Sequence, residues 1–228
     1  RDRSCPVVVL DDADIERAAG AVALGGYINA GQVCISVQRV IVHEKVAADF
    51  LSALTPLVDA ITVGDPKDEK NKVGTLISED EAKRVEAAIN TAISCGAQLH
   101  TGGQRVGTII KPAIVTDVDP NSAFAQEELF GPAISISTAQ SRNEAIAIAN
   151  HSPYGLGAGI FTQNVDAAIQ AAREVEAGIV HINWTPLWRA DLMPYGGVKA
   201  SGIGKEGVRS TVEEMTEVKT VIMHGQPW

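Results

Sequence analysis

This sequence has few of the residues that mark specialised proteins. Aromatic residues make up 4% of the 228 residues, and there are three cysteines. Cys5, Cys34 and Cys95 are odd in number and widely spaced, so they suggest neither a disulfide framework nor a zinc-binding pattern. Thiols left free in this way favour a reducing compartment, and we expect a cytoplasmic protein. The five histidines also lack the spacing of metal ligands, so no metal is expected.

Long apolar runs and clusters of positive charge are missing too. No run approaches the roughly 18 to 20 apolar residues of a membrane span, and residues 1–6 lack the apolar core of a signal peptide. A formal net charge of −9 and a pI near 5.0 argue against a nucleic-acid surface. The first residue is not Met and residues 6–10 already resemble a strand, so we expect the chain to begin inside a larger protein.

The sequence does contain alternating strand and helix patterns. This alternation predicts an α/β fold with a mostly parallel sheet and helices on both faces. Ser78 to Glu81 form a capping box, Pro56 should kink its helix or remove one hydrogen bond, and Gly102-Gly103 marks a turn at 97–110. Strands are expected at 6–10, 39–43, 113–118, 133–138, 157–162 and 178–183, and helices at 13–28, 45–60, 78–96, 141–150 and 165–176.

Cys34 is the first candidate for chemistry. It lies in a run of small and amide residues between an expected helix and an expected strand, where Gly31 permits an unusual turn. A thiol becomes a nucleophile when it is at least partly ionised, which requires nearby N–H donors, a helix end or a base. The alternative is that Cys34 is simply a small buried apolar residue.

A second candidate is the segment from Gln126 to Pro132. Within it, the carboxylate of Glu128 lies two residues before the aromatic ring of Phe130, and a Gly-Pro pair closes the segment. Such a pair can present an acceptor and a flat apolar face to one ligand, as a ribose diol and a nicotinamide ring require. The alternative is an exposed acidic turn that Phe130 anchors in the core.

Taken together, the motifs resemble those of the aldehyde dehydrogenase superfamily over almost the whole chain, in both order and spacing. The resemblance implies that Cys34 is the nucleophile, that Glu128 and Phe130 hold the nicotinamide ribose and ring of NAD or NADP, and that Glu206 is an outer proton-relay carboxylate. It also implies oxidation of a small aldehyde to a carboxylate through a cysteine thiohemiacetal and a thioester. The motifs are Gly31-Gln32-Val33-Cys34 with Arg39, Glu128-Leu129-Phe130-Gly131-Pro132, Pro153-Tyr154-Gly155-Leu156, and Pro194-Tyr195-Gly196-Gly197 with Ser201-Gly202.

The resemblance also implies parts that lie outside this sequence. The general base, the asparagine that completes the oxyanion hole and the dinucleotide-binding domain are expected upstream, so we expect the chain alone to be inactive. Residues 1–215 would form the catalytic domain, and residues 216–228 an oligomerisation strand and tail. The alternating segment 217–223 would pair with a neighbouring subunit in a homodimer or homotetramer.

The segment 184–193 should determine substrate choice, because it offers an apolar wall that includes Trp184 and a single cation, Arg189. Residues 189–197, together with residues 213–217, are similar to a branch of the superfamily that handles small polar or anionic aldehydes such as lactaldehyde, succinate semialdehyde or phosphonoacetaldehyde. We expect Arg189 to contact a substrate carboxylate or phosphonate. The alternative is a loop-stabilising ion pair between Arg189 and Asp191.

Other readings of the sequence are weaker. Residues 202–207 spell a dinucleotide-binding fingerprint, but they follow a loop rather than a strand, so we do not assign them to phosphate binding. A non-catalytic binding or assembly module that keeps the fold remains an alternative function. A cysteine hydrolase would need a Cys-His-Asn arrangement, for which the local sequence gives no support.

Overall fold

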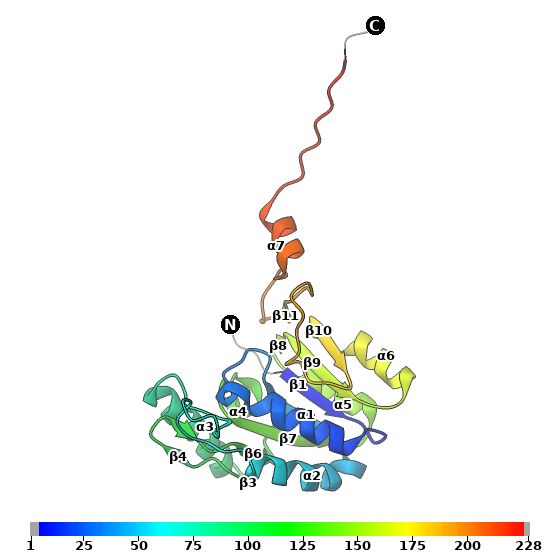
Figure 1. Cartoon of the computed structure of the whole chain (residues 1–228). Coiled ribbons are helices and arrows are strands. Elements are labelled where there is room, and N and C mark those ends of the chain that lie inside the picture. The colour runs from blue at the N-terminus through cyan, green and yellow to red at the C-terminus, as the bar shows by residue number, and fades with distance from the viewer. Residues whose placement is uncertain (1–4, 226–228) are drawn as a thin grey trace.

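The computed structural model describes residues 5–225 and is built around a seven-stranded sheet (Figure 1). Six strands are parallel, and only the edge strand β3 runs antiparallel to its neighbour. The prediction of a mostly parallel sheet is therefore confirmed. In spatial order the strands are β10 (Ile179–Ile182), β9 (Gly157–Phe161), β1 (Cys5–Val9), β2 (Val37–His43), β7 (Ala133–Ala139), β6 (Ala113–Thr116) and β3 (Gln98–Thr101).

Helices cover both faces of the sheet, because alternate residues of its strands point to opposite sides. On β2, Val40 and Val42 join the core beneath α1 (Ile15–Tyr27) and α2 (Ala47–Asp59), whereas Ile41 faces the opposite side. That second side is covered by α5 (Arg142–Asn150) and α6 (Val165–Glu174), and beyond them by α3 (Glu79–Ser94) with the short α4 (Ala123–Gln126). Within residues 5–225, no helix has the length and apolarity needed to cross a membrane.

Polar caps begin the helices near the expected positions. The side chains of Asp14, Ser78, Ser141 and Asn164 each accept a hydrogen bond from a backbone N–H in the first turn of α1, α3, α5 and α6. The Ser78 and Ser141 caps are confirmed, whereas the carboxylate of Glu81, expected to complete the capping box, accepts from Arg84. The helix expected at 45–60 is a 3-10 turn, Glu44–Val46, followed by α2, which continues through Pro56.

Two short antiparallel strand pairs complete the body. The region 97–110 contains β3 and a hairpin of β4 (Arg105–Val106) and β5 (Ile109–Ile110). Gly102 and Gly103 both have positive φ angles, as a turn at this point requires. A second antiparallel pair joins β8 (Tyr154–Gly155) to β11 (Val198–Lys199), which ties the segment after β10 to the start of β9.

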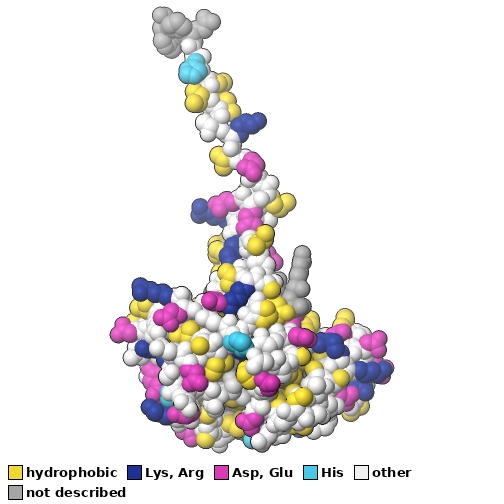
Figure 2. Space-filling view, turned by 180° about the vertical axis from the view of Figure 1, so that it is seen from behind, with side chains coloured by type: hydrophobic (Ala, Val, Ile, Leu, Met, Phe, Trp, Pro, Cys, Tyr) yellow, Lys and Arg dark blue, Asp and Glu magenta, His cyan; other side chains and the backbone are white. Residues whose placement is uncertain are grey.

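The chain then leaves the body as a C-terminal arm, residues 208–225, that consists of α7 (Val208–Met215) and an extended segment (Figure 1). Figure 2 shows hydrophobic side chains along this arm, and Val218 and Met223 are 97% and 90% exposed. The strand expected at 217–223 is not formed, because a strand needs a neighbour to share its backbone hydrogen bonds and this single chain provides none there. Its pairing with a second subunit stays a prediction.

Candidate active site

The candidate residues gather at the amino ends of the parallel strands. Cys34 lies three residues before β2, Phe130 three residues before β7, and Tyr154 three residues before the start of β9. Cys5 begins β1 and pairs in register with Val37 of β2. Since parallel strands begin at the same edge of a sheet, segments far apart in the sequence meet there.

The loop before Cys34 has an unusual backbone. Asn29, Ala30 and Gly31 have φ angles of 51°, 54° and 71°, so three consecutive residues adopt the left-handed conformation. A Cβ atom on Gly31 would lie 2.2 Å from the carbonyl oxygen of Gly131, a contact that no real side chain makes. Gly31 is therefore required both by its φ angle and by the close approach of the two loops.

Two glutamine side chains hold these loops in place. Gln32 donates from Nε2 to the carbonyl oxygen of Thr75 at 3.2 Å, and its Oε1 accepts from the N–H of Ile77 at 2.9 Å. Gln38 is buried, donates to the carbonyl oxygen of Glu127 at 2.7 Å and accepts from the N–H of Leu129 at 2.9 Å. The amide of Gln38 thus joins the strand that follows Cys34 to the segment that carries Glu128.

The thiol of Cys34 contacts a phenol. A turn closed by the N–H of Ser36 and the carbonyl oxygen of Val33, at 2.9 Å, brings Sγ of Cys34 to 2.6 Å from Oη of Tyr195. Tyr195 is only 4% exposed, and Cys34 itself is partly buried. The surrounding apolar cluster contains Cys5, Val33, Ile35, Leu156, Ile179 and Leu187. Cys34 is therefore neither a fully buried apolar residue nor a freely exposed thiol.

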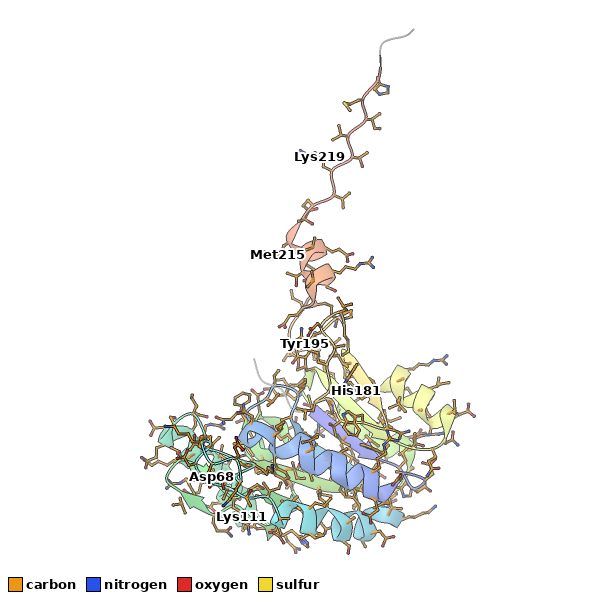
Figure 3. The ribbon with its side chains drawn as sticks, viewed as in Figure 1. Asp68, Lys111, His181, Tyr195, Met215 and Lys219 are labelled. Atoms are coloured by element: carbon orange, nitrogen blue, oxygen red, sulfur yellow. The ribbon has the colours of Figure 1, made fainter. Side chains whose placement is uncertain are left out.

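Tyr195 also contacts Arg189 and Glu206. The guanidinium carbon of Arg189 lies 4.4 Å from the centroid of the Tyr195 ring, and Nη1 lies 3.7 Å from Oε2 of Glu206. The backbones of Tyr195 and Glu206 exchange two hydrogen bonds, at 2.9 and 2.6 Å. Figure 3 shows Tyr195 where the arm joins the body. Among the described residues the ion-pair partner of Arg189 is Glu206, so the alternative pairing with Asp191 is wrong.

The predicted relay carboxylate, Glu206, is two-thirds exposed, and its carboxylate contacts Arg189. Within residues 5–225 no contact joins this carboxylate directly to Cys34, and its side-chain contacts lead to the thiol through Arg189 and Tyr195. A relay through Glu206 therefore stays a prediction.

Glu128 and Phe130 line an open pocket of about 530 Å³ with Glu81, Arg84, Glu127 and Tyr154. The φ angle of Phe130 is 48°, a left-handed value that is unusual for a large apolar residue. Its side chain is 38% exposed. The carboxylate and the ring thus share one open cavity, as an acceptor and a flat face for a single ligand require. A larger cavity of about 720 Å³ lies around Ser137 and Cys95, but Cys34 is not part of it.

The two tryptophans of the predicted substrate segment do not adjoin the thiol. Trp184 packs, partly buried, against the core beneath α1, and Trp188 meets His181 edge to face at 6.2 Å. Burial lowers the pKa of His181 below its usual value, and its Nε2 has no hydrogen-bond partner. Leu187 is the residue of this segment that reaches the cluster around Cys34, so an apolar contact to substrate is better placed there than at Trp184.

Arg39 has a structural position. Its guanidinium is buried and donates to the carbonyl oxygens of Ile148 and Ala149, at 2.6 and 3.4 Å, at the C-terminal end of α5. Burial lowers its pKa to about 10, so it remains charged at neutral pH and complements the negative end of the helix dipole. Sequence analysis named Arg39 only as part of a motif.

Tyr195 contacts the candidate nucleophile, but the sequence indicates this residue only as part of the motif from Pro194 to Gly197. Tyr195 and Cys34 are 161 residues apart, and no local pattern relates a hydroxyl to a thiol over that distance. A tyrosine within a Gly-rich loop after the last strand was the only available signal.

Comparisons with known proteins agree with this geometry. The model of the aldehyde dehydrogenase family matches residues 4–221. The chain is 43% identical to lactaldehyde dehydrogenase of Methanococcus maripaludis and 42% identical to 3-sulfolactaldehyde dehydrogenase of Priestia aryabhattai, over 96% and 95% of its length. It spans about half of each relative, 47% and 46%.

Solved structures give the same result. Glyceraldehyde-3-phosphate dehydrogenase GapN of Methanocaldococcus jannaschii, complexed with NADP, superposes with a TM-score of 0.92 at 41% identity, over 96% of this chain and 48% of that one. Aldehyde dehydrogenase 21 of Physcomitrella patens, in complex with the reaction product succinate, gives 0.93 at 35% identity, over 97% and 46%.

Proposed function

Because the chain belongs to the aldehyde dehydrogenase family, we propose that it is the thiol-bearing part of an enzyme that oxidises a small aldehyde to a carboxylate. The observation that carries this proposal is the position of Cys34. Its sulfur lies 2.6 Å from a hydroxyl, and its loop contacts the loop that carries Glu128 and Phe130. A nucleophile and a ligand-binding pair are thus held by one set of loops at one edge of the sheet.

The chemistry begins with the addition of the Cys34 thiolate to the aldehyde carbonyl. The backbone N–H of Cys34 would stabilise the resulting oxyanion. It is available because the N–H of Ser36, and not the N–H of Cys34, closes the turn around Cys34. Loss of hydride leaves a thioester on Cys34, and water hydrolyses it to the carboxylate. We propose that the general base for that step comes from a part of the complete protein that corresponds to the unmatched half of its relatives.

Glu128 and Phe130 are the residues that would hold the nicotinamide riboside of NAD or NADP. Their pocket fits this group, because it combines a carboxylate acceptor for a ribose diol with an exposed aromatic ring. When bound, the dinucleotide accepts the hydride. The protein provides the orientation, through the Gln38 bridge and the contact of Gly31 with Gly131.

The substrate is proposed to be small and polar or anionic. Arg189 is a cation linked to the thiol through Tyr195, whose ring lies against its guanidinium. The similar proteins are named for lactaldehyde and 3-sulfolactaldehyde, and one solved relative holds succinate. Arg189→Ala in the complete enzyme should lower kcat/KM for anionic aldehydes about tenfold more than for neutral ones. Equal losses for both would remove Arg189 from substrate recognition, and Arg173→Ala on the exposed surface of α6 is the matched control.

The arm and the cysteines support two further proposals. Apolar residues of the arm are exposed in the single chain, so we assign the arm to contact with a second copy, in a homodimer or homotetramer. The three cysteines Cys5, Cys34 and Cys95 are all free thiols, which fits the reducing environment of the cytoplasm.

The test is an assay of the complete protein for NADH and NADPH formation with a panel of neutral and anionic aldehydes. Cys34→Ala should lower kcat by at least about 10³-fold, because it removes the nucleophile. Cys95→Ala, at an exposed cysteine, should retain activity. If the complete protein shows no turnover with any aldehyde, the proposed oxidation fails and the non-catalytic binding module replaces it.

A further inference from the structure

The contact between Cys34 and Tyr195 is specific in its geometry. The sulfur and the phenolic oxygen are 2.6 Å apart, and the ring belongs to the buried cluster that surrounds the thiol. Two backbone hydrogen bonds to Glu206 fix the main chain of Tyr195. A hydroxyl held this closely restricts where the sulfur can lie.

The chemistry of the two groups decides which of them donates the hydrogen bond. A free thiol ionises near pH 8.5 and a free phenol near pH 10, so the sulfur loses its proton first. The phenol then donates to the thiolate, and a hydrogen bond to the charged form stabilises that form. In the neutral state either atom can donate, so the gain belongs mainly to the thiolate.

Arg189 strengthens this donor. Its guanidinium lies over the Tyr195 ring at 4.4 Å, and a cation on a ring face attracts its electrons. The withdrawal of electrons makes the hydroxyl a better hydrogen-bond donor. Glu206 keeps Arg189 in this position through the 3.7 Å ion pair. Glu206, Arg189, Tyr195 and Cys34 therefore form one connected chain from the exposed surface to the thiol.

We propose that Tyr195 is a positioning residue for the thiol step, whose hydroxyl holds Cys34 and stabilises its thiolate with the assistance of Arg189. The catalytic meaning of this inference rests on the proposed function. The stabilisation itself is a property of the thiol, and it can be measured without any turnover. It also gives Arg189 and Glu206 a role that does not depend on substrate contact.

The experiment is alkylation of the complete protein by iodoacetamide, without aldehyde or dinucleotide, between about pH 5.5 and 9.5. The rate at Cys34 is followed by mass spectrometry of its peptide, and the Cys95 peptide in the same digest is the internal control. Tyr195→Phe should move the midpoint of the Cys34 profile up by about one pH unit and lower the rate at pH 7 about tenfold. At the alkaline plateau the two proteins should react at similar rates, and the Cys95 profile should not move.

Arg189→Gln tests the second half of the chain and keeps the hydroxyl. It should move the Cys34 midpoint in the same direction by about half a pH unit. Thr162→Val is the matched control, because it also removes a buried hydroxyl hydrogen bond, from Thr162 to the carboxylate of Asp12, at the opposite end of the parallel strands. It should lower stability and leave the Cys34 profile unchanged.

The outcomes separate this inference from the proposed function. If the midpoint of the Cys34 profile in Tyr195→Phe equals that of the parent protein, the inference is overturned. This holds even if Cys34→Ala still abolishes turnover. If Tyr195→Phe does not fold, by circular dichroism, an unchanged midpoint in Arg189→Gln overturns it instead. A shifted midpoint in a protein that oxidises no aldehyde would support the thiolate contact and refute the dehydrogenase.

Discussion

The two ends of the parallel strands differ in how their polar groups are used. At the carboxyl ends, the buried hydroxyl of Thr162 donates one hydrogen bond shared between the two carboxylate oxygens of Asp12, at 2.7 and 2.9 Å, and the N–H of Gln163 donates to Oδ2 at 3.0 Å. Ser141 and Asn164 cap the helices that begin there. At the amino ends, Cys34 is partly buried and Phe130 lies open to solvent.

The backbone shows the same difference. At the carboxyl ends of β6 and β10, the left-handed positions are occupied by Asp117 and Asn183, residue types that tolerate that conformation. At the amino ends they include Ala30 and Phe130, for which the conformation is costly. Residues in this costly conformation thus lie beside the candidate thiol and the candidate cofactor pocket, and backbone strain of this kind clusters at functional sites.

Open parallel sheets usually bind ligands outside the carboxyl ends of their strands. In this sheet the candidate residues lie at the opposite end. The chain after β10 returns over the amino ends of the strands and contributes Tyr195 there. The following predictions change one end of the sheet at a time and follow both stability and Cys34 alkylation.

The largest effect is expected from Gly31→Ala at the amino end. The new Cβ would need a left-handed Ala and would overlap the carbonyl of Gly131, so the free energy of unfolding should fall by about 3 kcal/mol. Because Gly31 joins the two loops, the Cys34 alkylation rate should also change. Urea unfolding of the 228-residue chain measures the first effect.

Gly20→Ala is the matched control for that change. Gly20 is exposed within α1, and a Cβ there meets nothing within 4 Å. Alanine should therefore stabilise the chain by about 0.5 to 1 kcal/mol and leave the thiol unaffected. An equal loss of stability in both variants would contradict the assigned role of Gly31.

A smaller effect is expected from Asp12→Ala at the carboxyl end. The buried hydroxyl of Thr162 would lose its acceptor, which should cost about 2 kcal/mol in urea unfolding. Cys34 alkylation should be unchanged. Asp11→Ala, which removes only an exposed 3.4 Å ion pair with Lys45, should cost less than about 1 kcal/mol. A change in thiol reactivity with Asp12→Ala would break the distinction between the two ends.

The smallest effect concerns His181 on β10. Burial lowers its pKa in the folded chain, so the unfolded chain binds a proton more readily in the window just below pH 6.5. Stability is therefore fully present above that pH and is lost as the pH falls through it. His181→Gln should lose less stability than the parent sequence between pH 7.5 and 5.5, and equal losses would show that His181 does not contribute.

Local chemistry explains which features could be predicted from the sequence. The alternation of strands and helices, the Ser78 and Ser141 caps and the Gly102-Gly103 turn depend on neighbouring residues, and the structure contains them. The contact of Tyr195 with Cys34 and the pairing of Arg189 with Glu206 depend on how distant loops return across the sheet. The strand expected at 217–223 depends on a second chain, because its expected pairing partner belongs to a neighbouring subunit.

The most direct test of the central claim is to trap the acyl group on the protein. The complete protein would be mixed with aldehyde and oxidised dinucleotide, quenched in acid within one turnover and digested for mass spectrometry. The account predicts the mass of the acyl group on the peptide that contains Cys34, and its absence from the peptides of Cys5 and Cys95. An acyl group on another residue would contradict it. So would a Cys34→Ala variant that releases carboxylate as fast as the parent protein.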